Sequence, residues 1–342
     1  MNSSFSNIQL RIAALWAFSE AFLGGLLHAF QIPFAGLVLS AFAVICMAAI
    51  ALQNYERGQI LKATILVIIL KALLSPHTPV TAYFAVLLQG LFGELFFMFH
   101  LSFRISCLLL GIAALLQSAF QKLIILTLIF GIDFWKAVDE FLNSISKQMG
   151  LIAISYSFYI VAIFLSLHLI AGILTGFFAG RLPQFLSDAK QEFKTIKFSI
   201  PALETISSPM KKNKNKFANP LFWILFLLLA FALYQAYSEA SILIFIKSKA
   251  LKLFIRSTLF ILVWYFFVAP IIMLIFQKWL AKQQSKFSFE INGILKLLPE
   301  MKYITEQCWL RTKDYRGVKR ITQFIKFTFF SLHETSIENP IV

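Results

Sequence analysis

The sequence predicts an all-α, polytopic membrane protein: a six-helix transmembrane bundle, two further transmembrane helices and an amphipathic cytoplasmic tail. Hydrophobic residues make up 59% of the 342 residues and charged residues only 14%. Typical soluble domains have about 45–50% apolar residues and about 25% charged residues. A soluble fold of this length cannot bury so much apolar surface. The apolar residues also gather in runs close to the roughly 20 residues that a helix needs to cross a bilayer.

Eight such runs divide the chain. They cover residues 10–30, 35–52, 60–74, 80–98, 105–130, 151–180, 221–237 and 257–277. The fifth and sixth are long enough to tilt or to project from the bilayer, whereas the third is short. The predicted modules are a six-span module at 1–183, a basic linker at 184–220, a two-span module at 221–280 and a basic tail of amphipathic helices at 281–342.

Basic residues outnumber acidic ones by 31 to 16, which gives a formal net charge of +15. Much of the excess lies beside predicted spans, so we attribute it to the positive-inside bias and to anionic membrane lipid rather than to nucleic acid. This distribution predicts a multi-pass protein of the inner (plasma) membrane with both termini in the cytoplasm. The basic segment 247–256 falls on the outer side in that topology, and we interpret it as an amphipathic piece at the membrane interface.

Three connections of the first module then face outward, at residues 31–34, 75–79 and 131–150. In the last, apolar residues recur at three- and four-residue spacing with charges on the opposite face. This pattern predicts an amphipathic helix lying on the membrane, with Asp133 as its N-cap. The connections either close a pocket from outside or serve as short connectors.

Polar side chains inside the predicted spans are the candidate functional residues, because an ionisable group at membrane depth is costly unless it is paired or hydrated. They are Glu20, His28, Lys71, Gln89, Glu94, Gln117, Gln121, Lys122 and His168. A mixture of acid, amide and imidazole groups around a cavity suits a small polar solute. The predicted substrate-binding residues are Glu20, His77, Gln89, Glu94 and Gln117. In the structural alternative, Glu20 or Glu94 pairs with Lys71 or Lys122 to hold helices together, and His168 is a core residue.

Small residues form two seams at four-residue spacing. Ala13, Ala17 and Ala21 share one face of the first span. Gly172, Gly176 and Gly180 share one face of the sixth. Such seams let a second helix approach closely. That helix belongs either to the same bundle or to another protein.

Motifs for catalysis are missing from the sequence. It contains no GxxxxGK[ST], HExxH or GxSxG motif. Its three cysteines, Cys46, Cys107 and Cys308, lie far apart and form no CxxC pair. We therefore expect no enzyme, no cofactor and no metal. A cleaved signal peptide is not expected either, because the apolar segment after Arg11 carries Glu20 and leads into further spans.

The first module resembles a substrate-binding S component of energy-coupling-factor transporters. The resemblance covers residues 8–185 and rests on the six spans, the Ala13-x-x-x-Ala17-x-x-x-Ala21 seam and outer connections such as LLSPHTPVTAYFAVLLQGLFGELFF at 73–97. It implies that the alanine seam packs against a transmembrane coupling subunit. It also implies that a small-molecule substrate, such as a vitamin or precursor, is held near the outer surface and released inside by ABC-type ATPase subunits.

The tail contains Tyr315-Arg316-Gly317, which is similar to the Ala-Arg-Gly signatures of coupling helices in T components, where they dock onto the ATPases. Tyr315 replaces alanine, a second copy is missing, and two spans are fewer than a T component usually has. The resemblance implies a T-like coupling role for Arg316 and Gly317; the alternative is a basic tail lying on the inner leaflet. Two other functions stay open: a membrane scaffold whose tail recruits cytoplasmic proteins or anionic lipid, and an integral-membrane enzyme acting on lipid.

Overall fold

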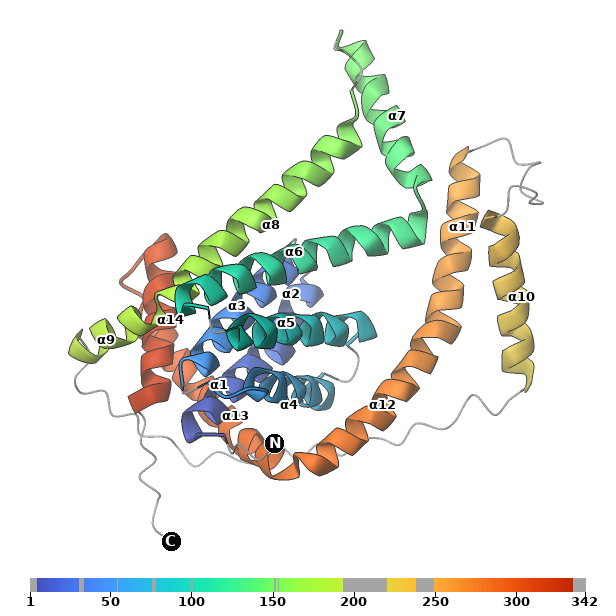
Figure 1. Cartoon of the computed structure of the whole chain (residues 1–342). Coiled ribbons are helices and arrows are strands. Elements are labelled where there is room, and N and C mark those ends of the chain that lie inside the picture. The colour runs from blue at the N-terminus through green and yellow to red at the C-terminus, as the bar shows by residue number, and fades with distance from the viewer. Residues whose placement is uncertain are drawn as a thin grey trace. The chain divides into compact units, whose positions relative to one another are not determined.

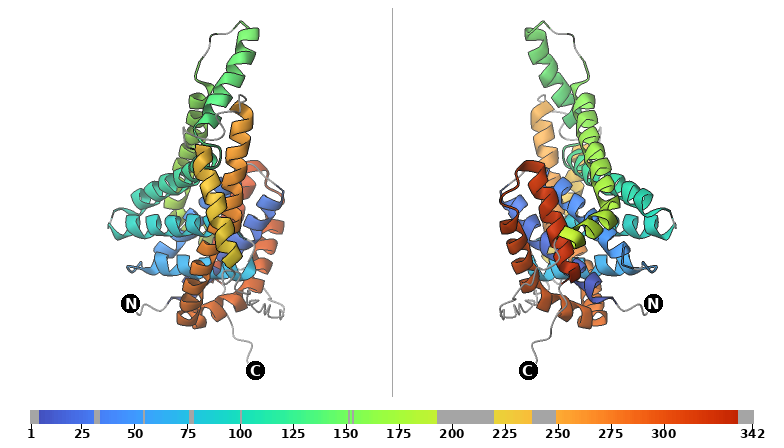
Figure 2. Two further views of the ribbon diagram at one scale, coloured as in Figure 1. Left: turned by 90° about the vertical axis from the view of Figure 1, so that its right-hand side faces the viewer. Right: turned by 90° about the vertical axis from the view of Figure 1, so that its left-hand side faces the viewer.

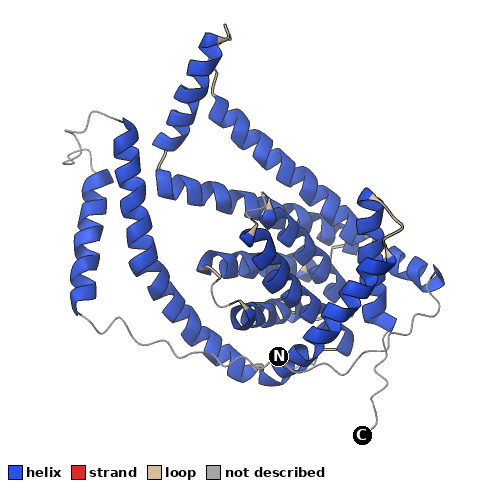
Figure 3. Cartoon of the chain, turned by 180° about the vertical axis from the view of Figure 1, so that it is seen from behind, coloured by secondary structure: helices blue, strands red, loops and turns tan. Residues whose placement is uncertain are grey.

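The computed structural model describes residues 5–30, 34–53, 55–75, 78–99, 101–150, 152, 154–192, 220–237 and 249–334. These residues are helical apart from short connections, and no strand occurs among them (Figure 3). The predicted all-α class is thus confirmed for the described part of the chain. The helices are α1 (Asn7–Phe18), η1 (Ser19–Leu23), α2 (Gly24–Ala29), α3 (Ala35–Ala51), α4 (Gln59–Leu74), α5 (Val80–Met98), α6 (Phe103–Phe130), α7 (Asp133–Gln148), α8 (Tyr156–Gly180), α9 (Leu182–Glu192), α10 (Pro220–Tyr237), α11 (Lys249–Val263), η4 (Trp264–Val268), α12 (Ala269–Lys286), α13 (Ser288–Arg311) and α14 (Gly317–Glu334).

Five of the helical segments in the described residues are long and apolar enough to cross a membrane. They are Asn7–Leu27, Val80–Met98, Phe103–Phe130, Tyr156–Gly180 and Leu253–Lys286. Two shorter apolar helices are Ala35–Ala51 and Trp223–Tyr234. Large apolar side chains such as Phe158 and Leu174 are more than 60% exposed on these helices, as expected for surfaces that face hydrocarbon. The protein is therefore membrane-embedded, and the exact count of eight spans stays a prediction.

One compact unit consists of Met1–Ser118, His168–Pro209 and Ala281–Val342. Helix α1 lies at its centre, in contact with α3, α4, α13 and α14, and it packs most extensively on α13 (Figures 1 and 2). Ser6 starts this helix with a capping box, in which its hydroxyl accepts from the Gln9 amide and the Gln9 side chain accepts from the Ser6 amide. Ile12 and Trp16 are fully buried. The N-terminal helix and the C-terminal helices thus share one core.

Glycines permit close helix approach at two places in this unit. A Cβ on Gly90 of α5 would lie 2.1 Å from the Thr64 Oγ1 of α4. Where α8 crosses α6, a Cβ on Gly172 would lie 2.8 Å from the Gly111 carbonyl oxygen, and one on Gly176 would lie 2.7 Å from that of Cys107. The predicted seam of the sixth span is therefore confirmed at these two glycines, and its partner helix is α6 of the same chain.

The other compact unit consists of Ala119–Leu167 and Met210–Leu280. In it, α7 is tied to the start of α8 because the Asp139 carboxylate accepts from the Ser157 amide at 2.6 Å and from the Ser157 hydroxyl at 2.7 Å. These hydrogen bonds lower the pKa of Asp139. The amphipathic helix predicted at 131–150 is confirmed as α7, with its charged residues on one face.

The expectation that Asp133 is the N-cap of α7 is wrong. Ile132 occupies the cap position, and Asp133 is the first helical residue. Its carboxylate instead pairs with Lys136 at 3.4 Å and with Arg256 of α11 at 3.1 Å. An acidic residue in the first turn of a helix is also favoured by the helix dipole.

Residues 249–286 form a continuous helical run through α11, η4 and α12, so the predicted interfacial segment and the eighth predicted span are parts of one run. The π-helical turn η4 precedes Pro270, which has no N–H to donate into the helical ladder. Lys247 and the rest of 238–248 lie outside the described residues. The two compact units group residues by packing in space and cut across the modules predicted along the sequence, which stay predictions.

Candidate functional site

Glu20 and Lys71 form an ion pair inside the N-terminal bundle. The Lys71 Nζ donates to the Glu20 Oε2 at 2.6 Å, and the two side chains are only 6% and 3% exposed, respectively. Two charges buried at this depth are costly unless they neutralise each other. The pair therefore joins η1 to α4, and among the described residues it is the only ion pair between these two helices.

Glu20 lies on the π-helical turn η1, between the regular helices α1 and α2. Gly24 and Gly25 follow this turn directly, and glycine is a weak helix former that tolerates irregular geometry. Isolated π-helical turns inside longer helices occur frequently at functional sites. Glu20 therefore stands out for two reasons: its backbone is irregular, and its charged side chain is buried.

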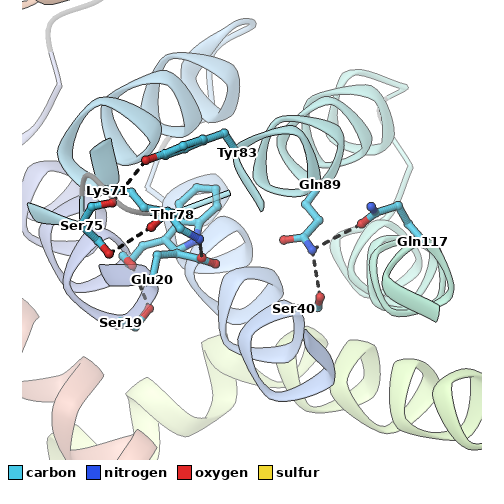
Figure 4. Close-up of polar contacts among 10 residues, drawn as sticks. Ser19, Glu20, Ser40, Lys71, Ser75, Thr78, Tyr83, Gln89 and Gln117 are labelled. Atoms are coloured by element: carbon cyan, nitrogen blue, oxygen red, sulfur yellow. Dashed lines mark hydrogen bonds and ion pairs between the residues drawn. The ribbon is translucent and has the colours of Figure 1, made fainter. Parts of the chain in front are cut away.

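Polar groups from the α4–α5 connection lie beside this pair (Figure 4). The Thr78 hydroxyl donates to the Ser75 hydroxyl at 3.0 Å, and the Tyr83 hydroxyl donates to the Ser75 carbonyl at 3.4 Å. Ser75 is therefore hydrogen-bonded both to Thr78 within the connection and to Tyr83 of α5. Together with Glu20 and Lys71, these groups offer both donors and acceptors.

Gln89 and Gln117 form a second polar group, which is separate from the first in Figure 4. The Gln89 Nε2 donates to the Ser40 hydroxyl at 2.9 Å and to the Gln117 Oε1 at 3.4 Å. Gln89 is 4% exposed, and its Oε1 is buried without a hydrogen-bond partner among the described residues. A buried acceptor of this kind costs free energy, about 1–3 kcal/mol, unless a ligand or water satisfies it.

Glu94 has a different environment from the other predicted binding residues. Its carboxylate accepts from the Tyr55 hydroxyl at 2.6 Å, from the Gly58 amide at 2.5 Å and from the Leu61 amide at 3.1 Å. All three donors belong to the α3–α4 connection and the start of α4. Burial and the bond to Glu94 raise the pKa of the Tyr55 hydroxyl, so it stays a donor. The geometry favours a structural role for Glu94 over contact with a solute.

The predicted histidine contacts are only partly described. His77 and the side chain of His28 lie outside the described residues. His168 is 2% exposed, and its ring centroid lies 6.0 Å from that of Phe34. Phe34 is the one described non-glycine residue with a positive φ, 65°, a conformation that is strained for a bulky side chain. His168 is thus a buried residue whose ring packs near that of Phe34.

The alanine seam of α1 faces the interior of the chain. Ala13 and Ala17 have no exposed surface, and Ala21 is half-buried. Ion pairs link the surrounding helices to α13: Arg11 lies 3.9 Å from Glu300, and Lys62 lies 2.8 Å from Glu290. Alanine side chains leave room for this close packing.

The hairpin of α13 and α14 presents its turn to the outside. Arg316 is exposed, and Gly317 starts α14 with a φ of 56°, in the left-handed region that favours glycine. The Arg320 guanidinium carbon lies 4.0 Å from the centroid of the Trp309 ring, which joins the two helices near this turn. The Arg-Gly step is therefore available to a partner on a turn that its neighbours hold in place.

Two cavities stand out in the described residues, and Glu20, Gln89, Glu94 and Gln117 line neither. The larger, of about 490 Å³, lies between the second half of α1, α3, α13 and α14 and is lined mostly by apolar residues such as Phe18, Trp309 and Phe324. The smaller, of about 280 Å³, is lined by residues of α6, α8 and α9, including two arginines. The described residues hold no cluster of three or more His, Cys, Asp or Glu placed to bind a metal.

Comparison with family models, curated proteins and solved structures yields no match for this chain.

Sequence reasoning missed several contacts of the polar residues it selected. Ser40 and Tyr55 carried no signal, because a serine in an apolar helix and a tyrosine in a connection are common. The ion pairs Arg11–Glu300 and Lys62–Glu290 join residues more than 200 positions apart, so no local spacing reveals them. Lys71 did carry a signal as a lone base in an apolar span.

Proposed function

We propose that this chain is the membrane-embedded, substrate-binding component of an ATP-driven uptake transporter of the energy-coupling-factor type, and that it carries its own coupling hairpin. It resides in the inner membrane with both termini in the cytoplasm. The observation that carries the proposal is the burial of the α1 alanine seam in a helix that packs most extensively on α13. The resemblance assigns this seam to contact with a coupling subunit.

The cargo is a small polar solute, held near the outer end of the bundle. Glu20, Lys71, Ser75, Thr78 and Tyr83 supply charges, donors and acceptors there. The orphaned acceptor of Gln89 provides a further polar contact. Release requires that the Glu20–Lys71 pair, or the connection above it, rearranges. A reaction is not part of the proposal: the chain is a binding and coupling component, and partner ATPases supply the energy.

The cavity of about 490 Å³ between α1 and the hairpin supports a movable contact. Protein interiors are normally close-packed, so an interface that retains this much unfilled apolar space can shift at a lower cost than a filled one. Leu15 and Phe18 of α1 border the cavity, whereas Ile12 and Ala13 of the same helix are fully buried and do not line it. The bundle could therefore tilt against α13 and α14 into the space of this cavity.

Co-purification tests the proposal. The full chain is extracted gently and examined by native mass spectrometry, where an ATPase and a stoichiometric small molecule are expected. Arg316→Glu should abolish ATPase association, whereas Lys313→Glu, a matched charge reversal at an exposed position of the same turn, should preserve it. Equal association of both variants with the ATPase, or no ATPase with the unaltered chain, would refute the proposal.

One observation favours a second function, a membrane scaffold or assembly factor. Glu94 uses its carboxylate to anchor the α3–α4 connection, and Glu20 is neutralised by Lys71, so these acids hold helices together without a solute. In that case the purified chain would bring down a larger protein complex and no small molecule.

A further inference from the structure

The smaller cavity of the described residues brings together two arginines that are far apart in the sequence. Arg104 lies in the first turn of α6, and Arg181 follows directly after the last residue of α8. The two helix ends touch, since a Cβ on Gly180 would lie 3.3 Å from the Cα of Arg104. Both arginines line the same cavity of about 280 Å³, together with Gln184 of α9.

Neither arginine has an acidic partner within the described residues: no carboxylate lies within 4.0 Å of either guanidinium group. The Arg181 guanidinium carbon lies 4.2 Å from the centroid of the Phe177 ring, which fixes its position without neutralising its charge. Two positive charges facing one small cavity attract an anion. Guanidinium groups bind phosphate oxygens with paired hydrogen bonds, and Gln184 adds an amide donor.

The remaining walls of the cavity are apolar, which bears on whether its ligand is a free ion or a lipid. Ile105 and Leu108 of α6 and Phe177 and Gly180 of α8 complete the lining. Ile105 is 49% exposed and Phe177 is 55% exposed, on helices that are both long and apolar enough to cross a membrane. The arginines therefore lie at the adjoining ends of two helices that are able to cross a membrane. Helix ends of this kind lie near the lipid headgroups, and the apolar wall would then face the hydrocarbon.

We infer that the cavity between Arg104 and Arg181 binds an anionic phospholipid, with the phosphate on the two guanidinium groups and an acyl chain along Ile105, Leu108 and Phe177. A free phosphate ion would use the arginines but not the apolar wall. The inference does not depend on the transporter proposal, because it requires only that the adjoining ends of α6 and α8 lie at the membrane surface.

The binding is measured on the full chain by native mass spectrometry, with phosphatidylglycerol or phosphatidylcholine added to the detergent-purified protein. Each basic residue near an anionic lipid contributes about fivefold to binding, so Arg104→Gln with Arg181→Gln should weaken phosphatidylglycerol binding about 30-fold. Arg104→Lys with Arg181→Lys, which keeps both charges, should retain most of the affinity. Phosphatidylcholine should bind weakly to every variant.

The matched control is Arg57→Gln with Lys282→Gln, which removes the same charge from two exposed positions outside the cavity. It should leave the affinity for phosphatidylglycerol within about twofold, since neither residue lines the cavity. An equal loss in the control pair would show a general charge effect and overturn the inference. Thermal unfolding of each variant verifies that the fold is retained. If the double glutamine variant unfolds, the double lysine variant still tests the site.

Competition separates a lipid from a free ion. A short-chain phosphatidylglycerol should displace the bound lipid at a much lower concentration than glycerol phosphate or inorganic phosphate, because only the lipid contacts the apolar wall. Displacement by inorganic phosphate at the same concentration as by the short-chain lipid would assign the cavity to a free anion and refute the lipid assignment.

Discussion

Replacing Glu20 by Gln is the most informative perturbation of the candidate site. The structure gives the pair a distance of 2.6 Å and less than 7% exposure for each side chain, so the variant leaves the Lys71 ammonium buried without a counter-ion. Removing one partner of a buried ion pair costs about 3–5 kcal/mol. Lys71→Met should cost a similar amount, because it leaves the Glu20 carboxylate alone.

The double variant, Glu20→Gln with Lys71→Met, removes both charges together. Replacing a buried ion pair with neutral residues of similar size is often close to neutral for stability. The unaltered chain, the two single variants and the double variant form a thermodynamic cycle. Because the double variant should cost little, we expect a coupling free energy close to the sum of the two single costs, about 6–10 kcal/mol. The assay is equilibrium unfolding in detergent, with the bound small molecule counted by native mass spectrometry on the same samples.

The two readouts separate the possible roles of the pair. Recovery of both stability and bound solute in the double variant would make the pair purely structural. Recovery of stability without bound solute would place Glu20 or Lys71 in contact with the cargo, as proposed. A cost of less than about 1 kcal/mol for either single variant would contradict the reasoning itself, because it would mean that the ions are hydrated or have other partners.

Three further outcomes follow from the geometry. Glu94→Gln should lower the free energy of unfolding by about 1–3 kcal/mol, with expression and solute binding falling together; loss of solute at unchanged stability would instead place Glu94 in the pocket. Gly176→Leu should destabilise the α6–α8 crossing by at least about 1–3 kcal/mol, because even a Cβ there meets backbone atoms at 2.7 Å, whereas Gly25→Leu, whose Cβ meets nothing within 4 Å, should unfold at the same temperature as the unaltered chain. Burial raises the pKa of Glu300 in the folded chain, so the folded state binds the proton more tightly and stability falls as the pH rises through the carboxyl titration. Unfolding midpoints over roughly pH 4–7 should show that slope in the unaltered chain, and an equal slope in Glu300→Gln would contradict it.

Much of the fold is predictable from the sequence, because hydrophobic run length and spacing are local properties. The predicted runs 80–98 and 105–130 nearly coincide with α5 and α6, and the amphipathic pattern of 131–150 gave α7. The cap of α7 was wrong by one residue, since a cap depends on backbone angles that Asp133 does not control. The basic stretch that begins at Lys249 and the apolar stretch after it belong to one helical run, and the interfacial position of the basic stretch stays a prediction.

The candidate site was less predictable. Charge at membrane depth correctly selected Glu20 and Lys71 as residues that need an explanation, and it left open whether they pair or bind a solute. The pairing itself, and the use of Glu94 to hold the α3–α4 connection, depend on which helices are neighbours. A helical pattern states which face a residue occupies but not which helix lies opposite.

The sequence by itself determined that the chain is helical and membrane-embedded, that alanine and glycine seams mark close packing, and that a few polar residues lie within otherwise apolar spans. Only the tertiary structure decided that α13, nearly 300 residues after the alanine seam of α1, packs on that same helix, and that Arg104 and Arg181 meet at one cavity. The physical reason is the distance over which each effect acts along the chain. Transfer into a bilayer depends on the residues of one segment, whereas the partner of a side chain depends on how all the helices pack together.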